Sequence, residues 1–172
     1  MGGRHEVRLA TPGDLDAIPT VEVASGELFR TVGLDAVADA PPTAGEVLAA
    51  AQEGGRLWVA LTESREVIGF ALGCYMDGHH HLQQVSVLPA HGRRGIGRSL
   101  VEAICAWAGR EGGRCVTLST FRDVAWNGPY YEKLGFRPLA ECQLGPDLLA
   151  TRADEQAQGL DISKRVIMQR DL

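Results

Sequence analysis

Short apolar runs rich in β-branched residues recur along the chain, and they predict strands. Residues 57–61 and 67–73 are two such runs, joined by a polar turn at residues 62–66. Residues 82–87 form a third run, which follows an interruption at Gly78-His-His-His. The remaining predicted strands cover residues 7–10, 115–119, 136–139 and 165–170.

Helices are predicted between these strands. In residues 95–110 the apolar positions recur at the spacing of one helical face, and Gly112 and Gly113 end the pattern. The other predicted helices begin at turn or capping residues. They cover residues 14–30 after Thr11, a segment from the capping box Thr43-Ala-Gly-Glu to Gly54-Gly55, residues 129–134 and residues 147–158, with a loop at residues 33–42.

The alternation of strands and helices is typical of one α/β domain. No internal repeat, low-complexity tract or linker interrupts the 172 residues, and a chain of this length can bury its own core. We therefore expect a single domain over residues 1–172.

A turn rich in glycine and arginine joins the strand 82–87 to the helix 95–110. Arg93, Arg94 and Arg98 crowd the start of that helix, where the helix dipole is already positive and cations are disfavoured. The unpaired backbone N–H groups of a helix start, together with small glycines, can bind a phosphate group. The turn therefore predicts a phosphate-bearing ligand.

Two common phosphate-binding motifs do not fit this turn. A Walker motif needs a lysine after Gly97, and the chain has Arg98 there. The dinucleotide fingerprint needs a glycine where the chain has Leu100. The sequence thus favours a phosphate ligand of another kind.

The residues Gly92-Arg-Arg-Gly-Ile-Gly97 resemble the acetyl-CoA loop of the GNAT N-acyltransferase superfamily, Gln/Arg-x-x-Gly-x-Gly/Ala, with Gly92 at the first position. Asn127-Gly-Pro-Tyr-Tyr-Glu-Lys-Leu-Gly-Phe136 resembles the second signature of that superfamily, a short helix that ends in Tyr-x-x-x-Gly-Phe. The resemblance extends over residues 8–137. It implies an α/β fold with a mixed, mostly antiparallel central sheet of about seven strands flanked by helices.

The resemblance implies that acetyl-CoA is the acyl donor. Its pyrophosphate would contact the backbone amides of residues 93–98, where glycines allow close approach. The preceding strand would run beside the pantetheine arm, and one of its N–H groups would polarise the acyl carbonyl. Asn127 has two alternative roles, as N-cap of the short helix or as a donor contact. The predicted donor-binding residues are Val85, Ser86, Val87, Arg93, Arg94, Gly95, Ile96, Gly97, Arg98 and Asn127.

Tyr131 matches the tyrosine of the second signature, and the resemblance implies that it is the general acid. A phenol with an ordinary pKa of about 10 is protonated at pH 7, so it can donate a proton to the departing thiolate. The neighbouring Tyr130 pairs at helical spacing with Leu134, and we expect Tyr130 to face the core.

The group that takes the proton of the amine stays open. Relatives often place a glutamate on the strand before the loop or on the next strand, where this chain has Gln83, Gln84 and Ser119. None of these three side chains accepts a proton at neutral pH. The candidates are His81, Glu22, Glu27 and a chain of water molecules.

Histidine and cysteine offer two other kinds of chemistry, and the sequence favours neither. His79, His80 and His81 are adjacent, so an extended chain turns them to opposite faces and we expect no metal site. None of the 4 cysteines forms a Cys-x-x-Cys pair or lies beside a histidine, so we expect small buried hydrophobes rather than nucleophiles. Direct transfer in a ternary complex is therefore favoured.

Composition and charge narrow the partners. With 45% hydrophobic and 23% charged residues the chain is typical of a globular protein. Its net charge of -5, with arginines gathered at one loop, argues against nucleic-acid binding and suits an anionic donor and a cationic amine. No signal peptide or membrane span is predicted, and with the unpaired cysteines this predicts a cytoplasmic protein.

These observations predict an N-acetyltransferase that acts on a primary amine of a small molecule. One alternative is an acyl-CoA-binding module without catalysis, suggested by Gln83 and Gln84 at positions where a base is expected. Another is an acetyltransferase for protein N-termini or lysines. The resemblance also leaves a homodimer open.

Overall fold

The computed structural model describes residues 5–172, and its strands follow the hydrogen-bonded order β1-β2-β3-β4-β5-β7-β6. The pairs β1–β2, β2–β3, β5–β7 and β6–β7 are antiparallel. The predicted α/β fold with a mostly antiparallel sheet of seven strands is therefore confirmed. The strands are β1 (Glu6–Leu9), β2 (Leu57–Leu61), β3 (Val67–Met76), β4 (His79–Val87), β5 (Cys115–Phe121), β6 (Arg137–Pro138) and β7 (Arg165–Asp171).

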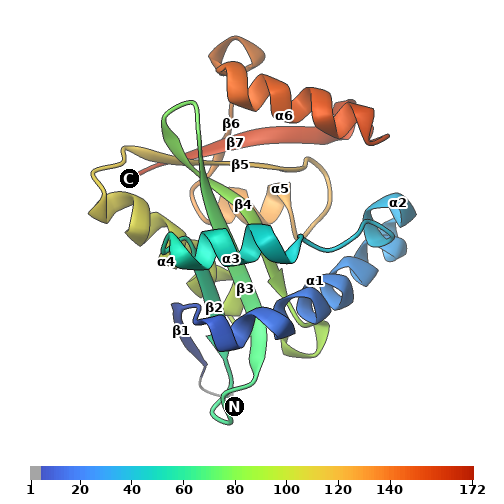
Figure 1. Ribbon diagram of the computed structural model, residues 1–172. Helices are drawn as coiled ribbons and strands as arrows, with labels where there is room; N and C mark the ends of the chain where they lie inside the picture. The colour runs from blue at the N-terminus through green and yellow to red at the C-terminus, as the bar shows by residue number, and fades with distance from the viewer. Residues whose placement is uncertain (1–4) are drawn as a thin grey trace. The chain divides into compact units, whose positions relative to one another are not determined.

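Helices flank these strands (Figure 1). The α-helices are α1 (Ile18–Gly26), α2 (Asp35–Ala38), α3 (Gly45–Glu53), α4 (Ile96–Arg110), α5 (Gly128–Lys133) and α6 (Pro146–Ala157). Short 3-10 segments are η1 (Pro12–Ala17), η2 (Glu27–Val32), η3 (Pro89–His91), η4 (Glu141–Gln143) and η5 (Ile162–Lys164).

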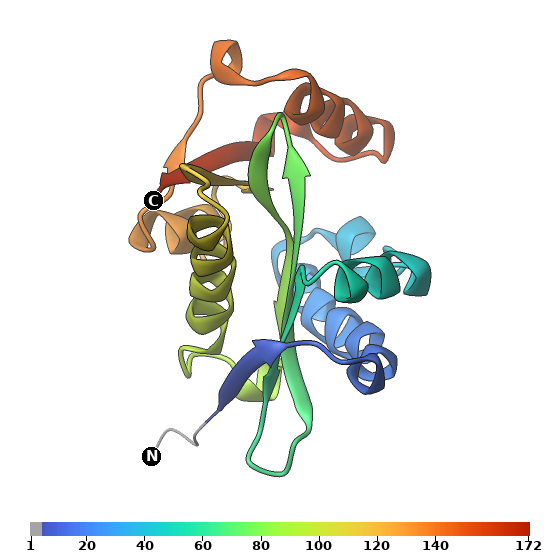
Figure 2. The same ribbon diagram turned by 60° about the vertical axis from the view of Figure 1, so that its left-hand side comes forward.

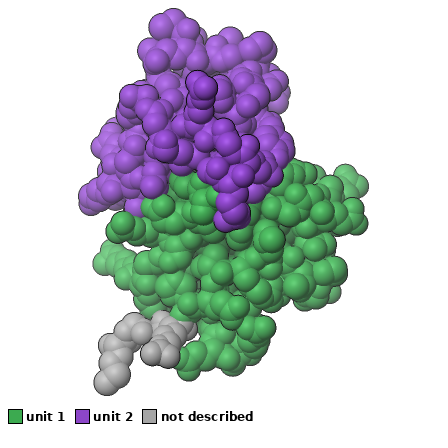
Figure 3. Space-filling view, turned by 90° about the vertical axis from the view of Figure 1, so that its left-hand side faces the viewer, with its two compact units in different colours: residues 1–74, 82–106 green, residues 75–81, 107–172 purple. Residues whose placement is uncertain are grey.

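The chain forms two compact units, which Figure 3 colours separately. Unit 1 comprises residues 1–74 and 82–106, and unit 2 comprises residues 75–81 and 107–172. Both units take residues from β3, β4 and α4. The single domain over residues 1–172 stays a prediction.

Unit 1 is built in layers around β2 and β3. One buried cluster joins α1 and α3 to these strands, and α4 lies on the opposite face (Figure 2). Gly69 of β3 allows α4 to come close, because a Cβ atom there would lie 3.2 Å from Cδ1 of Leu100. Among the members of the buried cluster are Ile18, Val21, Leu48, Ala51, Val59 and Phe70.

Unit 2 is built on the antiparallel pair of β5 and β7, whose register places Ser119 opposite Ile167 and Phe121 opposite Arg165. The helix α6 runs along this part of the sheet (Figure 1). Leu148 of α6 and Ile167 of β7 belong to one buried cluster, which fixes the helix on the strand.

The segment predicted as one helix over residues 14–30 is divided into η1, α1 and η2. Pro19 lies in the first turn of α1 and has no backbone N–H to continue a helix from the preceding segment. The predicted loop at residues 33–42 contains the short helix α2, so that prediction was wrong in part.

The capping box predicted at Thr43 does not form. The helix α3 begins after Ala44, which makes no side-chain cap. The Glu22 carboxylate of α1 instead accepts the backbone N–H of Thr43 at 2.9 Å and its hydroxyl at 3.0 Å. A carboxylate distant in sequence has replaced the local partner Glu46.

The interruption predicted at Gly78-His-His-His was also wrong. The turn lies at Asp77 and Gly78, whose φ angles of 52° and 75° suit a tight hairpin. The strand β4 begins immediately after them at His79, so the histidines belong to the strand.

Candidate functional site

The turn before α4 curls back on itself. The N–H groups of His91 and Gly92 donate to the carbonyls of Leu88 and Pro89 at 2.8 and 3.1 Å. Beyond them, Arg93 and Gly95 have φ angles of 60° and 80°, in the left-handed region. Left-handed residues beside right-handed ones turn successive backbone N–H groups toward one concave side, a common anion-binding arrangement.

The start of α4 lacks a negative group from the chain itself. Its first turn contains no acidic residue. The backbone N–H groups of residues 93–98 have no acceptor within the described part of the chain. Arg93, Arg94 and Arg98 are exposed there. Free amides, a helix dipole and three cations together fit a phosphate or pyrophosphate group.

Packing beneath the turn holds it in place. Ile96 and Leu100 are buried at 2% and 0% exposure, so the apolar side of α4 is fixed. The hydroxyl of Ser99 donates to the carbonyl of Gly95 at 3.2 Å, and Nε2 of His5 lies 3.0 Å from the same hydroxyl. The sequence analysis did not identify this His5 contact, because 94 residues separate the two partners.

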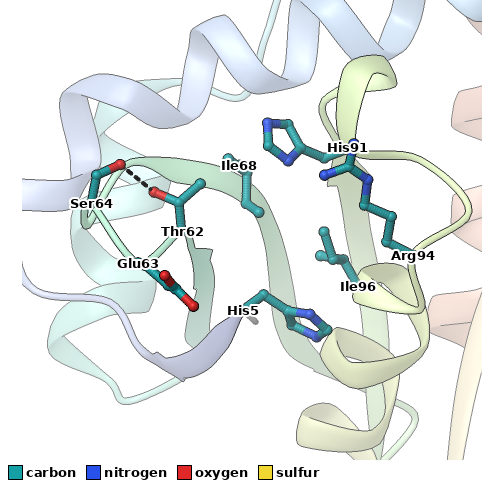
Figure 4. Close-up of a pocket in the computed structure, with 8 residues that line it drawn as sticks. All are labelled: His5, Thr62, Glu63, Ser64, Ile68, His91, Arg94 and Ile96. Atoms are coloured by element: carbon teal, nitrogen blue, oxygen red, sulfur yellow. Dashed lines mark hydrogen bonds between the residues drawn. The ribbon is translucent and has the colours of Figure 1, made fainter. Parts of the chain in front are cut away.

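A pocket of about 340 Å³ lies beside the turn (Figure 4). Arg94 and His91 line it from the turn, and the loop between β2 and β3 lines it from the other side. The structure therefore places Arg94 at the edge of a pocket beside the turn. The remaining lining residues are His5, Thr62, Glu63, Ser64, Ile68 and Ile96.

The end of β4 leads into the turn. Ser86 is buried at 5% exposure and accepts a hydrogen bond from Nε2 of Gln84 at 3.2 Å. Val85 and Val87 are half-buried. These three residues and residues 93–98 all lie in unit 1, so nine of the predicted donor-binding residues belong to one compact unit.

Tyr131 lies on α5 in unit 2 and is buried at 7% exposure. Its ring packs against Phe136 at 5.7 Å and against Tyr130 at 5.4 Å between centroids. Tyr130 is only half-buried, so the prediction that it faces the core was wrong, and Tyr131 occupies the more enclosed position. Adjacent residues of a helix point about 100° apart, and packing of this short helix decides which is enclosed.

Burial raises the pKa of Tyr131, with the neighbouring Tyr130 adding to the rise and Arg165 opposing it. The phenol is therefore protonated throughout the physiological range. Its Oη atom has no hydrogen-bond partner among the described residues. A protonated, unpaired hydroxyl is suited to donate a proton.

Asn127 occupies the N-cap position of α5, and its carbonyl accepts the N–H of Tyr131 at 2.9 Å. Its side chain does not cap the helix, which corrects one of the two predicted roles. Nδ2 donates to the carbonyl of Trp126 at 3.2 Å, while Oδ1 is buried and has no partner within the described residues. The amide oxygen of Asn127 is thus an unpaired polar atom at the start of α5.

The three side chains considered as proton acceptors have other partners. Burial lowers the pKa of His81 to about 4, and its Nδ1 lies 2.8 Å from the Thr117 hydroxyl. Glu22 accepts two hydrogen bonds from Thr43. Glu27 is exposed and pairs with Arg30 at 2.9 Å. The lowered pKa makes the enclosed His81 imidazole a poor proton acceptor. The two carboxylates are each held by a partner within unit 1.

The neighbouring histidines have separate partners. Nε2 of His80 lies 2.9 Å from the Glu111 carboxylate, and Tyr75 donates to the same carboxylate at 2.7 Å. His80 also packs edge-on against Trp107, with ring centroids 4.5 Å apart. Residues 5–172 contain no group of three side chains able to hold a metal ion.

Sequence reasoning missed a polar cluster in unit 2, made of Ser119 on β5, Glu155 on α6 and Arg165 on β7. Arg165 Nη2 donates to Glu155 Oε1 at 2.6 Å and to the Ser119 hydroxyl at 3.0 Å. Glu155 is buried at 8% exposure. A signal was present, because Glu155 lies two helical turns after the buried Leu148, on the apolar side of α6.

Comparison with known proteins gives a consistent result. A family model described as an acetyltransferase (GNAT) domain matches residues 53–138. A GNAT family acetyltransferase from Brucella melitensis, solved in complex with acetyl-CoA, is 27% identical over 84% of this chain and 90% of that chain, with a TM-score of 0.57.

Two less identical structures share the fold. A GNAT acetyltransferase from Staphylococcus aureus is 13% identical over 98% of this chain and 99% of that chain, with a TM-score of 0.73. The PaiA N-acetyltransferase from Thermoplasma acidophilum, in complex with coenzyme A, is 14% identical over the same shares of the two chains, with a TM-score of 0.68. Within the described residues, no helix has the length and apolar character needed to cross a membrane.

Proposed function

Because this chain belongs to the GNAT acetyltransferase family, we propose that it transfers an acetyl group from acetyl-CoA to a primary amine of a small molecule. The observation that carries the proposal is the start of α4, where free backbone amides and three arginines have no acidic partner in the first turn. A pyrophosphate supplies the negative charge that this helix start lacks.

In this proposal the donor is bound mainly by unit 1. The amides of residues 93–98 bind the pyrophosphate, and Arg93, Arg94 and Arg98 neutralise its charge. Val85, Ser86 and Val87 of β4 run beside the pantetheine arm, and one of their N–H groups polarises the acetyl carbonyl. The free Oδ1 of Asn127 accepts a hydrogen bond from the donor. The proposal treats residues 1–172 as one functional domain.

Tyr131 is the proposed general acid. The amine nitrogen attacks the carbonyl carbon in a ternary complex, and the departing thiolate takes the phenolic proton. The enclosed position and the unpaired hydroxyl of Tyr131 support this assignment. No covalent acyl-enzyme is needed. Burial raises the pKa of Cys74 to about 11 and also raises that of Cys115, so neither thiol is an activated nucleophile.

A small acceptor is favoured over a protein acceptor. The segment between β6 and β7 contains α6, and in this proposal that segment restricts the groove that an extended peptide would need. The net charge of -5 favours approach of a cationic amine. We further propose a cytoplasmic location, because the free cysteines suit a reducing compartment. The proposal is compatible with a homodimer.

Calorimetric titration with acetyl-CoA tests the donor site. We expect micromolar binding by the unaltered chain and its loss in the variant Arg94→Glu with Gly97→Glu. Arg110→Glu, at the other end of α4, is the matched control and keeps the affinity. Absence of binding to acetyl-CoA, other acyl-CoAs and free coenzyme A contradicts the proposal.

Release of free thiol in the presence of a panel of primary amines tests transfer. We expect turnover with at least one small amine, and a loss of about 100-fold or more in Tyr131→Phe at unchanged acetyl-CoA affinity. Binding without turnover for small amines and for peptide amines supports the alternative of a non-catalytic acyl-CoA-binding module.

A further inference from the structure

The cluster of Ser119, Glu155 and Arg165 joins three elements of unit 2 through one short network. The Ser119 hydroxyl donates to Glu155 Oε1 at 2.7 Å and accepts from Arg165 Nη2 at 3.0 Å. Ser119 is half-buried, whereas Glu155 is 8% exposed. The hydroxyl is therefore the more accessible end of the network, and the carboxylate is the enclosed end.

The ion pair is not built for maximal stability. A structural arginine–carboxylate pair uses two parallel hydrogen bonds, with both carboxylate oxygens engaged. Here only Oε1 of Glu155 pairs with Arg165, at 2.6 Å. Oε2 of Glu155 and Nε of Arg165 are buried and have no partner among the described residues. The carboxylate therefore keeps one oxygen, Oε2, outside both the ion pair and the Ser119 hydrogen bond.

The Ser119 hydroxyl can accept one more hydrogen bond. A hydroxyl has one donor and two acceptor sites, and the donor site is already directed at Glu155. One acceptor site receives Arg165. The remaining lone pair of a half-buried oxygen can take an N–H of an ammonium group, which places that group one hydrogen bond from the carboxylate.

The charges of this network also act on other candidate groups of unit 2. The Glu155 charge acts on the His81 imidazole, together with that of Asp77. The Arg165 charge acts on the phenol of Tyr131, the proposed acid. Arg165 also lies over the Phe121 ring, 4.5 Å from its centroid. His81 of β4 and Tyr131 of α5 are thus groups whose pKa responds to the charges of Glu155 and Arg165.

We propose that Glu155 is the terminal proton acceptor for the acceptor amine and that the Ser119 hydroxyl relays the proton to it. This inference rests on the proposed acetyl transfer and supplies the proton acceptor that the sequence left open. Arg165 is a positioning residue, which holds Oε1 against Ser119.

The protons balance in this step. The acceptor ammonium gives one proton to the Ser119 oxygen while Ser119 gives its own proton to Glu155. The neutral amine then attacks the acetyl carbon, so that a C–N bond forms and the C–S bond breaks. The thiolate takes the proton of Tyr131, and the second amine proton restores Tyr131 through solvent. Glu155 releases its proton to solvent, so each turnover yields one free proton.

A pH profile separates this relay from a structural role. We would measure kcat/KM with the best small amine from the panel, from pH 6.5 to pH 10, for Ser119→Ala and Glu155→Gln. At pH 7 we expect a loss of about 100-fold in each. The loss shrinks toward the unaltered rate as pH passes the pKa of the amine, because a neutral amine needs no proton acceptor.

Three further variants serve as controls. Asp154→Asn makes the same carboxylate-to-amide change at an exposed neighbour on α6, and we expect an unchanged profile. Ser119→Thr keeps the hydroxyl and restores activity lost in Ser119→Ala. The double variant Ser119→Ala with Glu155→Gln loses no more than either single change, because both interrupt the same relay.

Folding is checked independently of activity. Glu155→Gln leaves Arg165 without its anionic partner, so thermal unfolding and acetyl-CoA titration accompany each profile. Ser119→Ala keeps the ion pair, and its profile decides the question if Glu155→Gln does not fold.

The outcomes distinguish two failures. If the unaltered chain acetylates no amine, the proposed function fails and this inference fails with it. If the unaltered chain is active and the deficit of Ser119→Ala is absent or is the same at every pH, only the inference is overturned.

Discussion

Two helical segments of unit 1 begin in opposite ways. The segment η1 begins beside its own carboxylate, since Asp14 accepts the backbone N–H of Thr11 at 2.7 Å and the Thr11 hydroxyl at 2.8 Å. Arg8 completes this arrangement with two contacts to the same carboxylate. The helix α4 begins with arginines, free amides and no acidic residue in its first turn.

This difference distinguishes a helix start that the chain neutralises from one that it leaves positively charged. A helix start is electropositive, and negative charge from the chain or from outside stabilises it. At η1 the Asp14 carboxylate supplies the negative charge, and we call this the closed start. The start of α4, which has no acidic residue in its first turn, is the open start. At α4 the chain adds cations instead, which is unfavourable for the folded protein alone and favourable once a phosphate group is bound.

The largest expected effect comes from giving α4 an acid of its own. We expect Arg98→Glu to weaken acetyl-CoA binding about 100-fold, because it reverses a charge beside the proposed pyrophosphate site. The same change favours the helix dipole and raises the free energy of unfolding by about 0.5 kcal/mol without ligand. Calorimetric titration and thermal unfolding measure the two effects. Equal affinity in the variant would show that the α4 start does not bind the donor.

The reverse experiment removes the acid from the closed start. We expect Asp14→Asn to lower the free energy of unfolding by about 2 kcal/mol, because the Asp14 side chain is only 10% exposed and pairs with Arg8. Acetyl-CoA affinity stays the same. The exposed Asp16→Asn is the matched control for denaturant unfolding. If both changes lower the free energy of unfolding equally, the Asp14 carboxylate has no special role in stability.

The closed start also predicts a pH dependence of stability. The hydrogen bonds from Arg8, with those from Thr11, lower the pKa of Asp14 to about 2. An unfolded aspartate has a pKa of about 4, so the stabilisation is full above that pH and is lost as pH falls toward 2. Urea unfolding between pH 5 and pH 2 should show this loss in the unaltered chain. The change of the unfolding free energy with pH should be smaller in Asp14→Asn. If it is unchanged in that variant, other carboxylates cause the pH dependence.

The smallest effect concerns the backbone of the open start. Gly95 has a φ angle of 80°, and we expect Gly95→Ala to lower the free energy of unfolding by about 1 kcal/mol. Gly109, within α4, has open space around it, so Gly109→Ala should raise the free energy of unfolding by up to about 1 kcal/mol. Thermal unfolding of the two variants tests the opposite signs. Shifts of the same sign would contradict the role given to the left-handed turn.

Local patterns predicted most of the elements. The strand at residues 57–61 and the helix at 95–110 were located to within one residue, because both combine a clear apolar period with flanking turn residues. Asp14 was correctly expected near a helix start. The capping box predicted at Thr43 was wrong because the carboxylate of Glu22, distant in sequence, accepts the hydrogen bonds of the Thr43 N–H and hydroxyl. Local capping rules do not include such competitors.

The candidate site likewise contains features that the sequence predicted and features that it did not. The turn at residues 92–98 was predictable because all its chemistry lies in consecutive residues. The enclosed position of Tyr131 rather than Tyr130 was not, because two adjacent residues of a short helix differ only in direction. The network of Ser119 and Glu155 joins residues 36 apart, and no local period indicates such a contact.

The sequence by itself determined the fold class, the turn rich in glycine and arginine before α4 and the family resemblance, because these depend on residue order and on short-range backbone geometry. Only the tertiary structure decided which polar groups are buried, which are engaged and which remain free. His81, Glu22 and Glu27 gained partners, while Oε2 of Glu155 was left without one among the described residues. Burial and pairing depend on residues far apart in the chain, and these contacts set the protonation chemistry of the site.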